Sequence, residues 1–418
     1  MANSTAAKRQ TKPEKPRPDF PLFPHQTGRW AKKVKGSTRY FGYIADDPKG
    51  VVALQKWLDQ KDELLAGRTP ANQDGLTVAK LCNLFLSAKA DSRDSGELAP
   101  ITFADYLRTC KILTEAFGRS RLALDLAADD FRALRAKLAK VYGPVRLGNT
   151  VTRIRTIFKW GLENKYLAAP VTFGSDFRKP SKAKLRAHRQ RSGKKMFEAN
   201  EIRELVSSAE QPLKAMILLG INCGFGNNDC GTLPASAIDL DRGWVNFPRP
   251  KTAVERLCPL WPETAAAIRE AIARRPVAKN SEHDNLVFLT KYGHAWAKQI
   301  KIVERQDEAG KPETAVVGDN SPITKEFAKL FKVKKGHTEP AVKFQRGGRN
   351  FYALRHTFET IGGESLDQVA VNAIMGHVDD SMAGQYREGI SDGRLQTVVD
   401  CVRAWLFPQS AANSAEEA

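Results

Sequence analysis

Apolar residues recur at helical spacing along most of the chain, and this pattern predicts a mainly helical protein with small β-sheets. In the front half the predicted helices cover residues 51–65, 76–88, 102–117, 130–141 and 147–167. In the back half they cover residues 200–207, 212–221, 262–274, 321–331, 350–361, 368–375 and 395–407. Short strands are expected around a glycine-containing turn in 28–43 and at 244–248 and 256–260. We therefore expect an α+β fold.

A chain of 418 residues is too long for one ordinary core, so several domains are expected. Changes in composition place them at 1–19 (disordered basic tail), 20–66 (small unit), 74–170 (helical domain), 171–195 (basic linker), 196–407 (largest domain) and 408–418 (disordered tail). The apolar stripe of the last helix, 395–407, belongs either to the core of its own domain or to a docking face for a neighbour.

The charge of the chain indicates an anionic partner. Lys and Arg together number 66 and Asp and Glu 47, which gives a net charge of +19 and a pI of about 9.6. Nucleic acid is the usual partner of such a surface, and a membrane surface is the competing interpretation. No apolar run is long enough to span a bilayer, and the N-terminus has no apolar signal segment, so we expect a cytoplasmic protein without membrane contact.

The six cysteines form no CxxC pair, and Cys223 and Cys230 have no histidine at ligand spacing. We therefore expect reduced, mostly buried thiols and no zinc site.

Two stretches carry basic side chains suited to DNA phosphates. The helix 147–167 has a basic face that includes Arg153, Arg155 and Lys159. Residues 178–195 hold nine basic and no acidic residues, among them Lys182, Lys184, Arg186, Arg189 and Arg191. Such a run repels itself, so we expect it to stay extended and to lie along DNA. A solvated helix face and a plain flexible linker are the alternatives.

The most informative motif is Tyr352-Ala-Leu-Arg355-His356-Thr357, which is followed by Gly376-His377 and then by Tyr386. Transfer of a DNA phosphate to a protein side chain needs a nucleophile, cations for the non-bridging oxygens and an acid for the leaving oxygen. Arginine suits the oxygens because its planar fork binds phosphate through two hydrogen bonds and keeps its charge. The motif supplies an arginine, a histidine and a tyrosine in an order that suits this chemistry.

These residues resemble the catalytic domain of the tyrosine recombinases, the phage integrase family. The family hallmark H-x-L-R-H-T corresponds to 352–357, and L-G-H followed nine residues later by the nucleophile corresponds to Met375-Gly376-His377 and Tyr386. The lysine of the family's β-hairpin corresponds to Lys251, which precedes the Arg256…Pro259-Leu260 strand. The units 20–66 and 74–170 resemble, less specifically, the family's arm-binding and core-binding (SAM-like) modules.

The resemblance implies a role for each matched residue. Tyr386 would form a 3′-phosphotyrosine link, Arg355 would clamp the scissile phosphate, His377 would hydrogen-bond it, and Lys251 would be the general acid. It implies a site-specific recombinase or integrase of a mobile element, with double-stranded DNA as substrate and four protomers on two DNA sites, in the prokaryotic cytoplasm near the nucleoid. Because the covalent ester keeps the bond energy, no metal, ATP or other cofactor is expected, and the chain has no GxxxxGK[ST] loop.

Two positions depart from the family pattern. Gly226 stands where G-x-R-x-x-E-L has its arginine, and Tyr352 stands where the first histidine is expected. Loss of a charge-stabilising arginine slows such a reaction by orders of magnitude. We expect Arg249, Arg346 or Arg349 to supply the missing cation. The alternatives are a catalytically impaired DNA-binding regulator of the same fold and a type IB topoisomerase. Retention of Lys251 and the other three catalytic residues argues against the first, and the several front modules argue against the second.

Overall fold

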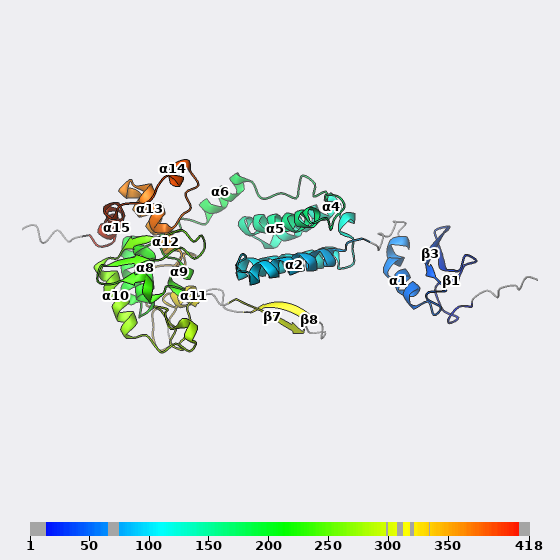
Figure 1. The fold of residues 1–418 in the computed structure, drawn as a ribbon, viewed down its shortest axis with the longest axis horizontal. Coiled ribbons are helices and arrows are strands. Elements are labelled where there is room, and N and C mark those ends of the chain that lie inside the picture. Colours follow the sequence, from blue (N-terminus) through cyan, green and yellow to red (C-terminus); the bar gives the residue numbers. More distant parts are fainter. Residues whose placement is uncertain are drawn as a thin grey trace, which may run out of the picture. The chain divides into compact units, whose positions relative to one another are not determined.

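The computed structural model describes residues 14–65, 75–297, 300–306, 312–317, 322–333 and 335–408 (Figure 1). The chain divides into two compact units, residues 1–181 and 182–418, and each is described by itself. The tails predicted at 1–19 and 408–418 lie largely outside the described residues. Within the described residues, no helix combines the length and apolar character needed to cross a bilayer.

The first unit begins with a small antiparallel sheet of β1 (Phe23–Pro24), β2 (Arg29–Val34) and β3 (Ser37–Tyr43), with β2 in the centre. Lys35 and Gly36 join β2 to β3 with positive φ angles, as a two-residue hairpin turn requires. The helix α1 (Val51–Leu65) packs on the sheet through Trp57, whose ring contacts that of Phe41. The predicted strands and the helix 51–65 are confirmed.

Four helices follow in the same unit: α2 (Val78–Asp94), α3 (Pro100–Phe117), α4 (Ala128–Val141) and α5 (Pro144–Glu163), with a 3₁₀ turn at Ala123–Asp125 (Figure 1). Their apolar faces enclose one core, in which the ring of Phe131 contacts four other phenylalanine rings. Proline at the first position of α3 and of α5 fixes where these helices begin, because its missing N–H is not needed there. The four helices overlap the predicted ones, and their ends differ from the predicted ends by up to six residues.

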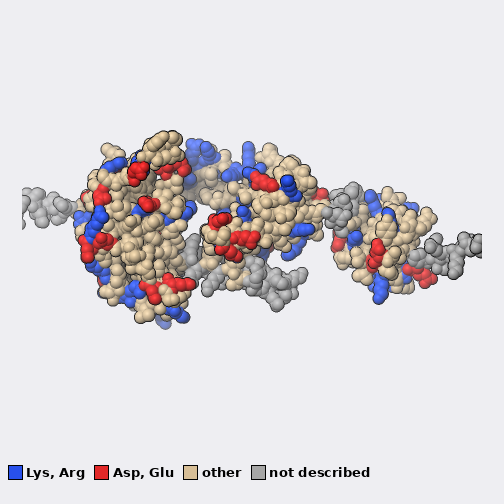
Figure 2. All heavy atoms as spheres, in the orientation of Figure 1, with Lys and Arg blue, Asp and Glu red and all other residues tan. Residues whose placement is uncertain are grey.

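The basic segment 178–195 is not extended throughout, and this expectation was wrong. Residues 182–191 form the helix α6 (Lys182–Arg191), which has no buried residue and presents Lys and Arg side chains to solvent (Figure 2). Lys, Arg, Ala, Leu and Gln are strong helix formers, and repulsion between like charges one turn apart costs only a few tenths of a kcal/mol per pair. The basic residues in the last turn also face the negative end of the helix dipole.

The second unit is built around α8 (Leu213–Asn222), which is buried on all sides. The helices α7 (Ala199–Ser208), α10 (Pro262–Ala273), α12 (Ala353–Gly362) and α15 (Asp392–Leu406) pack against it (Figure 1). The apolar stripe of α15 is buried in the core of its own domain, and the Val399 carbonyl accepts a hydrogen bond of 2.9 Å from Trp261 Nε1. Of the two interpretations of this stripe, the structure supports the internal core.

A three-stranded antiparallel sheet, in the order β4 (Ile238–Asp239), β5 (Trp244–Asn246) and β6 (Leu257–Pro259), lies beside the helices. The remaining helices are α9 (Asn227–Gly231), α11 (Pro322–Lys329), α13 (Gln368–Met375) and α14 (Met382–Gln385), with 3₁₀ turns at Ala235–Ala237, Ser281–His283 and Gly363–Ser365. A second hairpin, β7 (Lys301–Gln306) with β8 (Pro312–Val317), was not predicted from the sequence.

Candidate active site

Arg355 holds two distant loops of the second unit together. Its side chain projects from α12 and is only 3% exposed. Nη1 donates a hydrogen bond of 2.6 Å to the Gly224 carbonyl, and Nη2 donates one of 2.6 Å to the Met375 carbonyl. Gly224 has a φ of +62°, a conformation that glycine adopts without strain. The predicted phosphate clamp is thus fixed in a single orientation by the backbone around it.

His377 lies directly beside this guanidinium. Nη2 of Arg355 is 3.1 Å from Nε2 of His377, and because arginine can only donate, Nε2 is the acceptor. The proton then sits on Nδ1, which faces Asn372 Oδ1 at 3.3 Å and Glu359 Oε2 at 3.9 Å. Burial and the neighbouring Arg355 charge lower the pKa of His377 below its usual value. The imidazole is therefore neutral at pH 7 when the site holds no anion.

The loop between β5 and β6 closes over the turn that carries His377. Arg249 Nη1 and Thr252 Oγ1 each donate a hydrogen bond of 3.3 Å to the Gly376 carbonyl. Lys251 stands between these two residues and is exposed. Gly376 has a φ of +61°, and a β-carbon there would lie 2.9 Å from Arg249 Cβ. The structure thus brings Arg249 and the Lys251 loop to the His377 turn.

The two positions that depart from the family pattern touch each other. The Tyr352 ring lies against Gly226, where a β-carbon would be 3.1 and 3.2 Å from two ring carbons. Tyr352 is 40% exposed, and its ring packs edge-on against that of His356, with ring centroids 5.5 Å apart. The space that a side chain at position 226 would enter is therefore occupied by Tyr352.

A buried ion pair under the site was missed by the sequence reasoning. Arg256, which is 1% exposed, donates a hydrogen bond of 3.1 Å from Nη2 to Asp229 Oδ1 and one of 2.9 Å from Nε to the Phe247 carbonyl. The other Asp229 oxygen accepts the Gly226 N–H at 2.6 Å. Burial lowers the pKa of Arg256, and Asp229 opposes this shift. A charged residue at the edge of an apolar strand was the available signal in the sequence.

The other two candidate cations have structural partners. Arg349 forms a forked ion pair with Glu201, at 2.5 and 2.8 Å, and also donates to the carbonyls of Met196 and Gln345. Arg346 Nε donates to the Arg349 carbonyl. Both guanidinium groups thus brace the segment that precedes α12.

Tyr386 is not part of the assembled cluster. It follows the short helix α14, is 78% exposed, and its hydroxyl forms no hydrogen bond with any residue that the structure describes. Its neighbour Arg387 pairs with Asp379 at 3.0 Å. The structure thus brings together Arg355, His377, Arg249 and Tyr352, with Lys251 on an adjoining loop, and leaves the predicted nucleophile at the surface.

Residues 195–390 match the family model described as "Phage integrase family". This segment is a phage integrase family domain. No curated protein matches the chain. The expected family is therefore confirmed, and the cluster just described lies inside the integrase domain.

Solved structures show that the fold is shared at low sequence identity. A lambda integrase tetramer bound to a Holliday junction is 14% identical, with a TM-score of 0.50 over 90% of this chain and 98% of that one. A Tn1549 transposon integrase in complex with transposon right end DNA is 16% identical, with a TM-score of 0.51 over 78% of this chain and 100% of that one. These similarities confirm the predicted α+β, multi-domain fold.

The basic residues predicted to bind DNA differ in their surroundings. In α5, Arg153 pairs with Asp105, and Arg155 donates to the Phe177 carbonyl at 2.6 Å, so both stabilise the helical unit. Lys159 is exposed and lies 3.4 Å from Glu163. The basic residues of α6 are all exposed at its surface, namely Lys182, Lys184, Arg186, Arg189 and Arg191.

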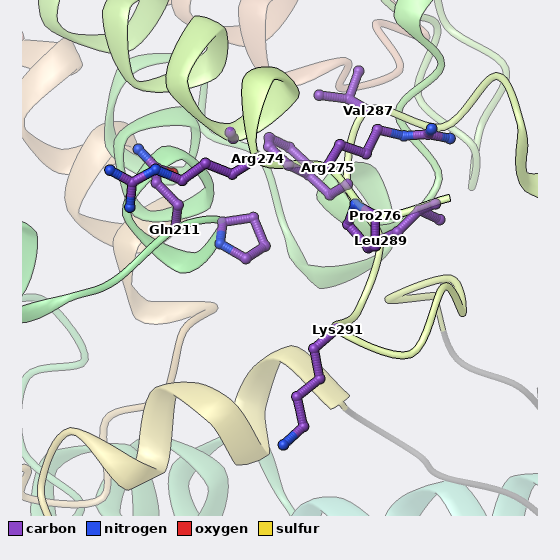
Figure 3. A pocket seen from close by; sticks show the side chains of 10 residues that line it. Gln211, Arg274, Arg275, Pro276, Val287, Leu289 and Lys291 are labelled. Carbon is purple, nitrogen blue, oxygen red and sulfur yellow. The ribbon is translucent and has the colours of Figure 1, made fainter. Parts of the chain in front are cut away.

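One pocket of the integrase domain lies apart from these groups. It has a volume of about 130 Å³ and is lined by residues that include Gln211, Arg274, Arg275 and Lys291 (Figure 3). Arg275 donates to three backbone carbonyls and Arg274 pairs with Glu270, so their charges already have partners. Among the described residues, no group of three or more His, Cys, Asp or Glu could hold a metal ion. All six cysteines are free thiols and five are buried, as predicted.

Proposed function

We propose that this integrase-family protein cuts and rejoins DNA at specific sites through a 3′-phosphotyrosine intermediate. The observation that supports this proposal is the Arg355–His377 pair, in which two backbone carbonyls fix the Arg355 guanidinium and its Nη2 lies 3.1 Å from His377 Nε2. Groups fixed in advance in this way stabilise developing charge without having to reorganise.

In the proposed reaction, the Tyr386 oxygen attacks the scissile phosphorus while its phenolic proton passes to solvent. The bond from phosphorus to the 5′ oxygen breaks, and Lys251 donates a proton to that oxygen. Arg355 binds the non-bridging oxygens, and His377 donates a hydrogen bond to one of them after the bound anion favours protonation of its imidazole. Tyr352 is a further hydroxyl donor at the position of the family's histidine. Rejoining reverses these steps. The ester keeps the energy of the broken bond, so the reaction consumes no cofactor.

The remaining parts of the chain are proposed to bind DNA. We assign arm-type DNA binding to 20–66 and core-site binding to 74–170, and we propose that the linker 171–195 follows the DNA backbone through α6. The exposed basic side chains of α6 support the last assignment, because phosphate contacts need cations that DNA can reach at the surface. A homotetramer on two DNA sites is proposed because the structurally similar lambda integrase forms a tetramer on a Holliday junction.

Covalent capture tests the proposal. Double-stranded DNA ligands selected from a random pool by binding to the full chain would be nicked near each candidate scissile position and incubated with wild type and with Tyr386→Phe. We expect an adduct of one protein mass on a denaturing gel with wild type alone. DNA binding without an adduct in either protein would instead support the non-catalytic regulator. Relaxation of a supercoiled plasmid that lacks the selected site would support the topoisomerase.

A further inference from the structure

The integrase motif in this chain supplies only one guanidinium. Gly226 has no side chain, so Arg355 is the single motif arginine that can face the phosphate. The transition state of phosphoryl transfer spreads negative charge over several oxygens, and each fixed donor there contributes strongly to the rate. A second cation near Arg355 is therefore expected from the chemistry, and three arginines were open candidates.

The turn at the end of α13 distinguishes Arg249 from the other two candidate arginines. Arg355 is anchored on the carbonyl of Met375 and Arg249 on the carbonyl of Gly376, at 2.6 and 3.3 Å. These are successive residues, whose Cα atoms are about 3.8 Å apart. His377 comes next and accepts a hydrogen bond from Arg355. One turn thus places two guanidinium groups and an imidazole side by side.

The electrostatics of this cluster agree with its geometry. The Arg249 charge is, after burial, the largest cause that lowers the pKa of Arg355. It also lowers the pKa of His377. Among the described residues, no carboxylate pairs with Arg249. Two like charges held together with no counter-ion of their own are costly, and a phosphodiester bound between them would relieve that repulsion.

The other buried or motif-adjacent arginines already have partners. Arg256 is neutralised by Asp229, and Arg349 by Glu201. Arg346 bonds the backbone next to Arg349. Recruiting one of these to phosphate would break bonds to its present partners, whereas Arg249 would give up only a weak bond of 3.3 Å.

We propose that Arg249 is a catalytic residue that supplies the second guanidinium to the scissile phosphate, in place of the arginine missing at Gly226. This inference rests on the proposed recombinase function. It places the second phosphate-binding cation on the β5–β6 loop, two residues before the proposed general acid Lys251. A single loop then carries both a cation for the non-bridging oxygens and the proton donor.

The test compares initial rates of adduct formation on the nicked duplex for wild type, Arg249→Ala, Arg249→Lys and Arg242→Ala. Arg242 is an exposed arginine of the same domain, paired with Asp392, and serves as the matched control for loss of one positive charge. We expect Arg249→Ala to be slower by about 100-fold or more, as for loss of one transition-state donor. Arg249→Lys should recover part of the rate, and Arg242→Ala should stay within about twofold of wild type.

A second substrate separates a phosphate contact from a structural effect. Replacing one non-bridging oxygen of the scissile phosphate by a methyl group removes the negative charge, in two stereoisomers. If Arg249 neutralises that charge, the ratio of wild-type to Arg249→Ala rates should fall by at least about tenfold for one isomer, because the lost donor then has no charge to stabilise. A misfolded variant would show the same ratio on both substrates, and that result would overturn the proposal.

The outcomes also separate this inference from the function on which it rests. Equal rates for wild type and Arg249→Ala, with no adduct from Tyr386→Phe, would overturn the role of Arg249 and leave the recombinase function standing. No adduct from wild type on DNA that it binds would overturn both.

Discussion

Breaking the Asp229–Arg256 ion pair is expected to destabilise the integrase domain strongly. The charged atoms are 3.1 Å apart and the Arg256 side chain is 1% exposed, so water screens the pair poorly. With an effective dielectric constant of about 20, the attraction at this distance is about 5 kcal/mol. Asp229→Asn leaves the buried guanidinium without a counter-ion, and we expect the free energy of unfolding to fall by about 3–5 kcal/mol.

Unfolding of the full chain in urea measures this loss of stability. Hydrogen exchange of the α8 peptide 213–222 is the readout, because that helix lies in the core of the integrase domain. The matched control is Asp392→Asn, which breaks the exposed pair with Arg242 at 2.6 Å. Exposed pairs contribute about 1 kcal/mol or less. Asp229→Asn should therefore lower the stability of α8 several times more than the control does.

The double variant Asp229→Asn with Arg256→Met completes the cycle. Removing both charges leaves no uncompensated ion. The double variant should therefore lose less free energy of unfolding than the sum of the two single-variant losses, by about 2 kcal/mol or more. Additive losses, or an Asp229→Asn effect no larger than that of Asp392→Asn, would refute the reasoning that burial makes this pair strong.

Three further predictions concern the site itself. Gly226→Arg should lower stability by about 1–3 kcal/mol because it meets the Tyr352 ring, and adding Tyr352→His should recover most of that loss in urea unfolding. Gly376→Ala should slow adduct formation at least about tenfold, since it strains a left-handed residue and displaces two arginine side chains, and an unchanged rate would contradict the described turn. The folded state holds the pKa values of His356 and His377 below the unfolded value of about 6.5. The unfolded chain therefore binds more protons, and stability should fall as pH drops below about 6.5. Replacing both histidines by glutamine should flatten the dependence of the urea midpoint on pH between about 5 and 7.

Periodicity and motif spacing predicted the parts of the fold that follow local rules. The buried helix α8 is apolar except at Lys214 and Asn222, and the motif around Arg355 lies on α12, which has a clear apolar face. Elements of a few residues, such as α9 and α14, are too short to show a helical period. The hairpin of β7 and β8 is rich in charged residues and has weak alternation, so its sequence resembles a loop.

The residues of the candidate site could be proposed from the sequence, but the contacts between them could not. The sequence left three arginines open as the second cation, because nothing local to positions 249, 346 and 349 distinguishes them. The choice depends on partners far along the chain, namely Glu201 for Arg349 and the Gly376 carbonyl for Arg249. The helix α6 was missed for another reason, since charge repulsion was given more weight than helix propensity.

The turn at residues 375–377 anchors the side chains of Arg249 and Arg355 and carries His377, so the positions of all three depend on one short segment. Its amides are held by the Gly376 N–H bond to Ala373 and the His377 N–H bond to Asn372, at 3.0 and 2.9 Å. Local opening of this turn would release both carbonyl anchors and the imidazole in a single step. The free energy of that opening, readable from exchange of these two amides, sets the fraction of molecules in which the proposed phosphate-binding cluster is intact at any moment.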